Sequence, residues 1–327
     1  MTSPFGALAG RGLTTGHGTE NDFLLVPDPD GELDLTAAEV AAACDRHAGV
    51  GADGLIRVVR TAALTGADQA ASAPADPAAP APVDPAGAAP APADAPAPAA
   101  VAGAEWFMDY RNADGSVAEM CGNGIRVFVH YLREQGLVDL PPGASIAVGT
   151  RGGIRQVAFD GERYTVAMGR WAMPGGLAAV QAGYDVIVQV PGLPGPRAGL
   201  RVTLPNPHTV VALPDEAALA AADLTGAVAY DPVPPAGTNL ELVVPLGDDD
   251  AGLGTVRMRV LERGVGETRS CGTGTCAAAL AVRAWGGPGA PDTWRVLVPG
   301  GEVLVHVDGD QVTLTGPAVL TADVTLR

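Results

Sequence analysis

Glu119-Met-Cys-Gly-Asn-Gly124 reappears in the second half of the chain as Arg269-Ser-Cys-Gly-Thr-Gly274. Both stretches consist of a cysteine, then Gly-x-Gly, then a run rich in apolar residues. A lone pattern of this kind is as typical of a tight turn as of a functional site. Two copies, one in each half of the chain, favour a duplicated architecture with a cysteine at the start of a helix in each half.

The residues that follow the two motifs predict helices of different character. After the first motif, apolar residues recur at helical spacing over 125–133, which indicates an amphipathic helix. After the second, the segment from Cys276 to Val282 is apolar on every side. A helix without a polar face must be enclosed, so we expect it to run through the centre of a curled sheet.

Strand patterns dominate the rest of the chain. Val256, Met258 and Val260 alternate with arginines, and turns divide 156–168 and 303–314 into two predicted hairpins. One clear helix start is the capping box Thr36-Ala-Ala-Glu39, which predicts a helix running through Cys44 toward His47. Many strands and few helices, without regular alternation, indicate an α+β fold.

Residues 65–103 differ sharply from the remainder, with 18 alanines and 9 prolines among 39 residues. Such a composition cannot bury a core and is typical of a disordered surface insertion. The runs 55–59 and 105–110 on either side predict strands. We therefore expect the insertion to replace a short hairpin loop and to have no catalytic role.

Composition excludes several classes of function. The 327 residues carry a net charge of −17, which argues against nucleic acid or an anionic membrane as partner. All 20 basic residues are arginine, so no lysine can form the Schiff base of a pyridoxal-phosphate enzyme. No apolar run approaches the roughly 20 residues of a membrane span, and no secretory signal is visible, so we expect a cytoplasmic protein.

The four cysteines divide into two kinds. Cys44, inside the predicted capped helix, and Cys276, five residues after Cys271, are interpreted as core residues. Cys121 and Cys271 each precede a helix, whose unpaired N–H groups and dipole favour a thiolate and can hold a carboxylate. No cysteine and histidine spacing indicates a metal site.

Inversion of a carbon stereocentre requires removal of a proton from one face and its return to the other. A thiolate and a thiol on opposite faces meet that need, and two helix N-termini would stabilise the charge on a substrate carboxylate between them. The duplicated motif therefore predicts a two-cysteine proton-transfer enzyme that needs no cofactor.

Two long stretches carry a resemblance to a known family. The sequence Asn112-Ala-Asp-Gly-Ser-Val-Ala-Glu-Met-Cys-Gly-Asn-Gly-Ile-Arg126 resembles the first active-site signature of diaminopimelate epimerases, and Glu262-Arg-Gly-Val-Gly-Glu-Thr-Arg-Ser-Cys-Gly-Thr-Gly274 resembles the second. Shorter matches lie at 21–23, 46–54, 206–208 and Asn239. Together they extend over nearly the whole chain apart from the insertion.

The resemblance implies interconversion of LL- and meso-2,6-diaminopimelate, in lysine and peptidoglycan precursor biosynthesis, without metal or pyridoxal phosphate. It gives Cys121 and Cys271 the roles of acid and base, and it places His208 and Glu262 where they would assist thiol ionisation. The implied substrate-binding residues are Asn21, Asn112, Gly122, Asn123, Asn206, Asn239, Glu262, Arg263, Gly272 and Thr273.

The implied fold consists of two similar lobes, each a curled, mostly antiparallel sheet around a central helix. We expect the N-terminal lobe at 1–148, the C-terminal lobe at 149–313, and a last strand within 314–327 that returns to the first lobe. The resemblance also implies a homodimer.

Three positions depart from the family pattern. Thr19-Glu20 and Leu204-Pro205 stand where glycine-containing pairs are usual, and Gly54 replaces a substrate-binding glutamine of some members, so Gly54 is left out of the site.

Two rival hypotheses remain. An isomerase like proline racemase would have histidine at Asn123, and one like the phenazine-biosynthesis proteins would lack the cysteine pair. A thiol redox or phosphate-binding protein could instead use the two cysteines as a regulatory disulfide or the glycine loops as an anion cradle.

Overall fold

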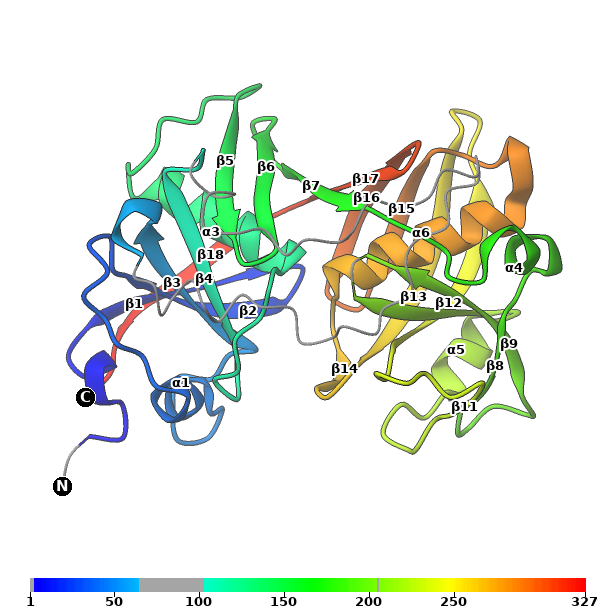
Figure 1. Cartoon of the computed structure of the whole chain (residues 1–327), viewed down its shortest axis with the longest axis horizontal. Coiled ribbons are helices and arrows are strands. Elements are labelled where there is room, and N and C mark those ends of the chain that lie inside the picture. Colours follow the sequence, from blue (N-terminus) through cyan, green and yellow to red (C-terminus); the bar gives the residue numbers. More distant parts are fainter. Residues whose placement is uncertain (1–2, 65–102, 205) are drawn as a thin grey trace. The chain divides into compact units, whose positions relative to one another are not determined.

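A computed structural model describes residues 3–64, 103–204 and 206–327, and the chain forms two compact units (Figure 1). Among the described residues, unit 1 contains 3–64, 103–166 and Gly316–Arg327. Unit 2 contains Ala167–Thr315 without residue 205. The predicted insertion, 65–103, lies outside the described residues except for Gly103.

Unit 1 is built on a mixed, mostly antiparallel sheet. Its strands follow the order β18-β1-β2-β3-β4-β5-β6-β7, with parallel pairing only at β2/β3 and β4/β5. The bounds are β1 (Gly12–Gly18), β2 (Asn21–Pro27), β3 (Gly54–Arg60), β4 (Trp106–Asn112), β5 (Ser145–Thr150), β6 (Gly153–Phe159), β7 (Tyr164–Arg170) and β18 (Val319–Thr325).

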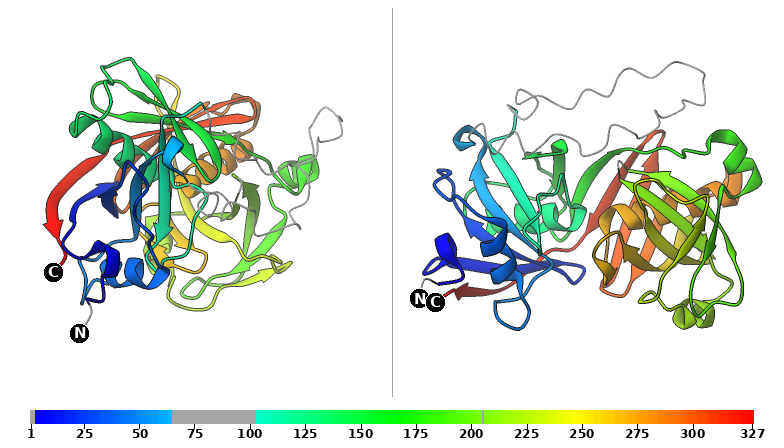
Figure 2. Two further views of the ribbon diagram at one scale, coloured as in Figure 1. Left: turned by 60° about the vertical axis from the view of Figure 1, so that its left-hand side comes forward. Right: turned by 60° about the horizontal axis from the view of Figure 1, so that its bottom comes forward.

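The two ends of the chain meet in this sheet. The last strand, β18, pairs antiparallel with β1, and the two run side by side in the right-hand view of Figure 2. Unit 1 extends to Val166, beyond residue 148, because β5 pairs with β4 and the β5–β6–β7 meander continues the same sheet.

The short helices of unit 1 are η1 (Gly6–Leu8), α1 (Ala37–Cys44) and η2 (Thr61–Ala63). The capping box of α1 is confirmed, since Thr36 and Glu39 exchange hydrogen bonds between side chain and backbone. The expected continuation toward His47 is wrong. Asp45 adopts extended backbone, and its carboxylate accepts hydrogen bonds from the N–H groups of His47 and Ala48, which ends the helix at Cys44.

The central helix of unit 1 is α3 (Gly122–Glu134), as the apolar spacing predicted. It packs against β1, β2, β3, β4 and β18, and its residues Ile125, Phe128, Val129 and Leu132 are fully buried. Full burial of each such side chain contributes about 1.5–3 kcal/mol to folding. The sheet of unit 1 thus fixes the direction of α3 and the position of its first turn.

Unit 2 repeats this plan with different connections. Its sheet order is β11-β8-β9-β10-β12-β13-β15-β16-β17, with β14 also paired to β13 and parallel pairing only at β10/β12 and β13/β15. The strand bounds are β8 (Val186–Gln189), β9 (Arg197–Thr203), β10 (Pro207–Ala212), β11 (Ala229–Asp231), β12 (Asn239–Asp248), β13 (Leu253–Glu262), β14 (Gly266–Thr268), β15 (Thr293–Val298), β16 (Gly301–Asp308) and β17 (Gln311–Gly316).

The helices of unit 2 are α4 (Gly176–Ala182), α5 (Glu216–Ala221), α6 (Gly272–Gly286) and η4 (Gly287–Gly289). Helix α6, coloured orange in Figure 1, contacts β9, β10, β12, β13, β15 and β16. All residues from Cys276 to Val282 are buried, so the prediction of an enclosed apolar helix is confirmed.

The α+β fold is confirmed, because each unit packs a mostly antiparallel sheet against one long helix. The two hairpins predicted within 156–168 and 303–314 correspond to β6/β7 and β16/β17. The strands that flank the insertion, β3 and β4, are antiparallel neighbours with Arg60 opposite Trp106. No helix in the described part of the chain is long and apolar enough to cross a membrane.

Candidate active site

The two motif cysteines have nearly identical local geometry. Cys121 is the N-cap of α3 with φ −134° and ψ 119°, and Cys271 is the N-cap of α6 with φ −126° and ψ 118°. In each helix the sulfur accepts a hydrogen bond of 3.4 Å from the N–H of the third residue, Gly124 or Gly274. Each thiol therefore takes the capping position that serine or aspartate usually fills, facing the positive end of the helix dipole.

The thiol of Cys121 lies against two predicted substrate-binding residues. Its sulfur is 3.7 Å from Oδ1 of Asn21, which also accepts a 3.2 Å hydrogen bond from Nδ2 of Asn123. Both asparagines are buried, Asn123 completely. The structure therefore brings Asn21, Asn123 and Cys121 together at the first turn of α3.

Asn21 is held by an ionic network that the sequence did not assign to the site. Its Nδ2 donates to Asp53 at 2.7 Å, and Arg46 bridges Asp53 at 2.8 Å and Asp22 at 2.7 Å. Burial, followed by the neighbouring charge of Asp22, raises the pKa of Asp53. Asp53 lies within the stretch 46–54 that resembles the family, but the sequence does not indicate that it contacts Asn21, which the fold shows.

Asn21 is also placed by a strained turn. The β1–β2 hairpin pairs Gly18 with Asn21 and leaves Thr19 and Glu20 at the tip, with φ of 53° and 59°. No other non-glycine residue in the described chain has positive φ. These values belong to the left-handed region that favours glycine or asparagine, the geometry required by a two-residue hairpin turn. The buried Thr19 hydroxyl accepts a hydrogen bond from Arg126 of α3, which ties the turn to the helix.

Asn112 has a different setting. It ends β4 opposite Gly54, and its side-chain amide donates to the hydroxyl of Ser116 at 2.9 Å. The Asn112 side chain is therefore engaged in a turn, and no described contact joins it to Cys121.

Around Cys271 the side chains form a continuous chain of contacts. The sulfur is 3.5 Å from Oγ1 of Thr273, which accepts a 3.2 Å hydrogen bond from Nδ2 of Asn206. Oδ1 of Asn206 is 3.1 Å from Nε2 of His208, whose Nδ1 is 2.7 Å from Oε1 of Glu241. His208 and Glu241 are fully buried, and Glu241 was not predicted. The sequence did offer a sign of its role. Glu241 is the one charged residue in the otherwise apolar run 240–244, and it lies two positions after Asn239, which places both on the same face of a strand.

The N–H that the helix start donates to Cys271 lowers the pKa of this thiol, as expected, but other effects outweigh it. Burial, and then the charge of Glu262, raise its pKa well above the usual value, outweighing the hydrogen bonds from Thr273 and Gly274. Glu262 therefore opposes ionisation of this thiol rather than assisting it.

The remaining predicted residues of unit 2 form a second group. Oδ1 of Asn239 accepts a 2.8 Å hydrogen bond from the backbone of Arg263, whose guanidinium donates to the carbonyl of Ala236 at 2.6 Å. The carboxylate of Glu262 accepts a hydrogen bond from the hydroxyl of Thr268. Parallel pairing of β10 and β12 sets Asn239 opposite His208, which connects this group to the Cys271 chain.

Gly122 and Gly272 are the first residues of α3 and α6. Both are buried directly after the motif cysteines. Their position leaves the backbone of each first turn free of side-chain bulk, as the sequence pattern indicated.

The other two cysteines lie in the cores, as the sequence indicated. Cys44 is 3% exposed, and burial raises its pKa to about 12. Cys276 is completely buried. Neither thiol has the setting of a reactive cysteine. Among the described residues no group of three or more His, Cys, Asp or Glu is arranged to hold a metal ion.

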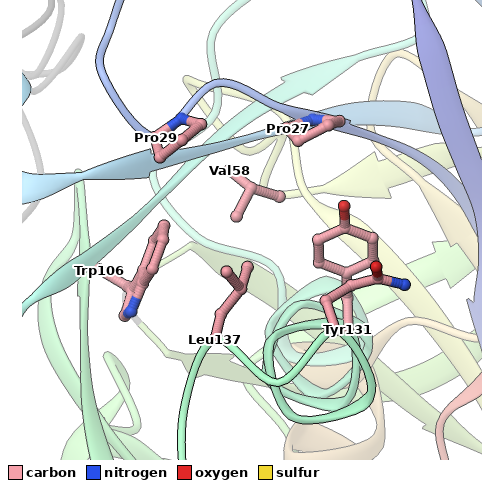
Figure 3. Close-up of a pocket in the computed structure, with 7 residues that line it drawn as sticks. Pro27, Pro29, Val58, Trp106, Tyr131 and Leu137 are labelled. Atoms are coloured by element: carbon pink, nitrogen blue, oxygen red, sulfur yellow. The ribbon is translucent and has the colours of Figure 1, made fainter.

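A separate pocket in unit 1 contains none of the predicted site residues (Figure 3). Tyr131 in α3 and Leu137, three residues after the end of this helix, face Val58 and two prolines of the β2 region across it. Tyr131 follows Cys121 by ten residues, which corresponds to about 15 Å along a helix. This pocket is therefore distinct from the cysteine site.

Solved structures share the whole fold at low sequence identity. A Bacillus anthracis protein of the PhzF phenazine-biosynthesis family has a TM-score of 0.58, 15% identity, and coverage of 96% of this chain and 98% of that one. A hydroxyproline epimerase from Agrobacterium vitis has a TM-score of 0.53, 13% identity, and coverage of 96% and 90%. The fold is thus that of the PhzF-like proteins and the proline racemases and epimerases.

Sequence comparison narrows this class. The diaminopimelate epimerase from Thermobifida fusca is 44% identical and covers 95% of this chain and 96% of its own length. The diaminopimelate epimerase from Rhodococcus jostii is 43% identical and covers 96% of each chain. The family profile for diaminopimelate epimerase matches residues 97–173 and 201–321.

The chain belongs to the diaminopimelate epimerase family. It is an isomerase, an amino-acid epimerase that works without pyridoxal phosphate. The rival hypotheses of a proline racemase-like enzyme or a pure thiol redox protein are thereby set aside.

Proposed function

We propose that this enzyme interconverts LL- and meso-2,6-diaminopimelate in lysine and peptidoglycan precursor biosynthesis, with Cys121 and Cys271 as its acid and base. The observation that carries the proposal is the matched geometry of the two thiols, each capping a helix and each accepting an N–H from a glycine. Relatives of about 43% identity over nearly the full chain are diaminopimelate epimerases, which supports the choice of substrate.

In the proposed reaction one cysteine thiolate takes the α-proton, and the electron pair of the C–H bond stays on the α-carbon beside the substrate carboxylate. The thiol of the other cysteine then gives its proton to the opposite face. The carbon is inverted, and thiolate and thiol have exchanged places. Because burial raises the pKa of Cys271, we propose that Cys271 starts as the acid and that Cys121 supplies the thiolate.

The substrate has two amino-acid ends, only one of which is inverted. We propose that Asn21, Asn123, Asn206 and Asn239 bind the polar groups of both ends, with Glu262 and Arg263 providing opposite charges. The N–H groups of Gly122 and Gly272 and the hydroxyl of Thr273 would face the substrate carboxylate at the helix starts. We also propose that Asn112 binds the substrate, as the family match implies.

The test is α-proton exchange of LL-2,6-diaminopimelate in deuterated water, followed by NMR for the wild type, Cys121→Ala and Cys271→Ala. We expect the wild type to incorporate deuterium with inversion and both variants to lose inversion. Inversion that survives in either variant would mean that another residue moves that proton. Proline enantiomers serve as the control substrate, and faster turnover of proline than of diaminopimelate would contradict the assignment.

We propose that the enzyme acts in the cytoplasm and associates as a homodimer, with diaminopimelate as its small-molecule partner. Analytical ultracentrifugation at micromolar concentration would give a mass near 66 kDa for a dimer, about twice the chain mass of 32.8 kDa. A single species at the chain mass would contradict the dimer.

A further inference from the structure

Glu241 is a fully buried carboxyl group with no role in the proposed function so far. It lies on β12 between aliphatic residues, and its only described side-chain partner is His208, at 2.7 Å. Its second oxygen, Oε2, has no hydrogen-bond partner among the described residues. Burial of a carboxylate with one oxygen unsatisfied costs free energy, whereas a protonated carboxyl tolerates it better.

The contacts between His208 and Cys271 have a definite direction. The amide group of Asn206 donates from Nδ2 to Oγ1 of Thr273, so its Oδ1 can only accept from Nε2 of His208. Since Thr273 accepts from Asn206, its hydroxyl proton is available for the sulfur of Cys271 at 3.5 Å. Every donor in the chain therefore points toward the sulfur.

This direction determines the protons on the buried pair. Nε2 of His208 must carry a hydrogen in order to donate to Asn206. One more proton must then lie between Nδ1 of His208 and Oε1 of Glu241, because two bare acceptors at 2.7 Å would repel each other. Whether it resides on the nitrogen or on the oxygen, the pair carries no net charge.

We infer that Glu241 is a positioning residue for proton transfer at Cys271: it shares one proton with His208 and so polarises the hydrogen-bond chain through Asn206 and Thr273 toward the sulfur. The inference rests on the proposed function and deepens it. When Cys271 gives its proton to the substrate carbon, its sulfur becomes negative. The shared proton then moves from Oε1 of Glu241 to Nδ1 of His208, no proton leaves the pair, and the resulting imidazolium strengthens each donor in the chain.

The alternative is that Glu241 is an ordinary anion that opposes ionisation of Cys271, so the charged groups around this thiol must be considered together. Glu262 at the end of β13 and Glu241 on β12 both face this thiol, and His208 on β10 reaches it only through the chain. Tyr230 on β11 also faces Glu241, and burial raises the pKa of its phenol to about 12. If Glu241 were an ordinary anion beside a neutral histidine, its removal would make the thiol easier to ionise.

Glu241→Gln separates the two possibilities, because glutamine keeps the shape but has no proton to lend. In a Cys121→Ser background we would measure the rate of Cys271 alkylation by iodoacetamide against pH, identifying the labelled peptide by mass spectrometry. We expect Glu241→Gln to raise the midpoint of this rate profile, and hence the pKa of Cys271, by about one pH unit. At a fixed pH below the midpoint this corresponds to about a tenfold smaller fraction of thiolate. An unchanged or lower midpoint would overturn the inference.

Nitrogen-15 NMR of the five histidines gives a second readout, with the His208 signals assigned by their loss in His208→Asn. In the wild type we expect a protonated Nε2 and a shared proton at Nδ1. In Glu241→Gln we expect a neutral ring with hydrogen on Nε2 only. A wild-type ring with a bare Nε2 would show that the chain runs in the opposite direction.

Glu216→Gln is the matched control, since it removes an exposed carboxylate from the same unit. It should change neither readout. If Glu241→Gln does not fold, Thr273→Val tests the last link of the chain, and Thr273→Ser should restore the wild-type midpoint by restoring the hydroxyl. Neither readout uses substrate, so a wild type that fails to invert diaminopimelate would refute the proposed function without affecting this result.

Discussion

Replacement of Gly274 by alanine tests the close approach between Glu241 and the first turn of α6. A Cβ at this position would lie 2.8 Å from Oε1 of Glu241 and 3.4 Å from the sulfur of Cys271. Real Cβ atoms do not approach an oxygen this closely. Because Glu241 is fully buried and its Oε1 contacts His208, we expect the carboxyl group to shift away from His208 to make room.

The expected magnitude follows from two opposing terms. Alanine in place of glycine inside a helix stabilises it by about 0.5–1 kcal/mol. Loss of a hydrogen bond that involves a charged group costs about 1.5–3 kcal/mol. We therefore expect Gly274→Ala to lower the free energy of unfolding by about 1–2 kcal/mol, and to lower kcat about tenfold because the Cys271 chain is disturbed.

Gly124→Ala is the matched control, because Gly124 occupies the same position in α3 and also donates its N–H to a cysteine sulfur. Its new Cβ would lie 3.3 Å from a methyl group of Ile56 and 3.4 Å from a ring carbon of Phe23, and its three nearest neighbours are all carbon atoms. A shift of a few tenths of an ångström relieves these contacts. The helix gain should then offset most of the cost.

The assay combines urea unfolding followed by circular dichroism with steady-state kinetics on LL-2,6-diaminopimelate. The reasoning would be refuted by a Gly274→Ala variant that is as stable and as active as the wild type. It would also be refuted if Gly124→Ala lost as much stability as Gly274→Ala, because the loss would then reflect helix starts in general rather than Glu241.

Three further predictions concern unit 1 and the insertion. Asp109→Asn should lower the free energy of unfolding by about 3–5 kcal/mol in urea, because it leaves the buried Arg57 and Arg151 without their shared partner. Arg151 and Arg111 outweigh burial and lower the pKa of Asp109, so its contribution to stability should be complete above the usual pKa of 3.8 and should be lost as the pH falls from there through the lowered pKa, as acid unfolding would show. Glu20→Asn should raise the melting temperature slightly, by relieving about 0.5–1 kcal/mol of left-handed backbone strain, and a lower melting temperature would contradict this account of the turn. Replacement of 65–103 by a short glycine-containing loop should leave kcat/KM within tenfold of the wild type, because β3 and β4 are antiparallel neighbours that a short loop can join.

Much of the fold could be predicted because its signals are local. The capping box at Thr36 and Glu39, the alternation along β13 and the apolar spacing of α3 all depend on residues close in sequence. The end of α1 at Cys44 was missed because Asp45 takes extended backbone to cap two following N–H groups. Aspartate competes with a helix in this way only when its side chain meets those groups, which composition does not reveal.

The side-chain networks could not be predicted because they join residues far apart in the sequence. Asp53 orients Asn21 from 32 positions away, and Glu241 meets His208 from 33 positions away. Parallel pairing of β10 with β12 creates the second contact, and sequence patterns do not give strand register between non-adjacent segments. The motif cysteines could be recognised from the sequence because the Gly-x-Gly pattern follows each of them directly.

The same duplicated motif stands in two different electrostatic settings, and this difference suits an enzyme that needs one acid and one base. The Cys121 sulfur meets the amide oxygen of Asn21, and the carboxylate behind that amide is paired with Arg46. The Cys271 sulfur is buried near Glu262, and burial together with this charge raises the pKa of the thiol, while a directed chain of donors that begins at Glu241 and His208 stabilises the sulfur when the proton leaves. Nearly identical local backbone thus supplies two equivalent positions for thiols, while the surrounding sheet residues give the two thiols different electrostatic environments.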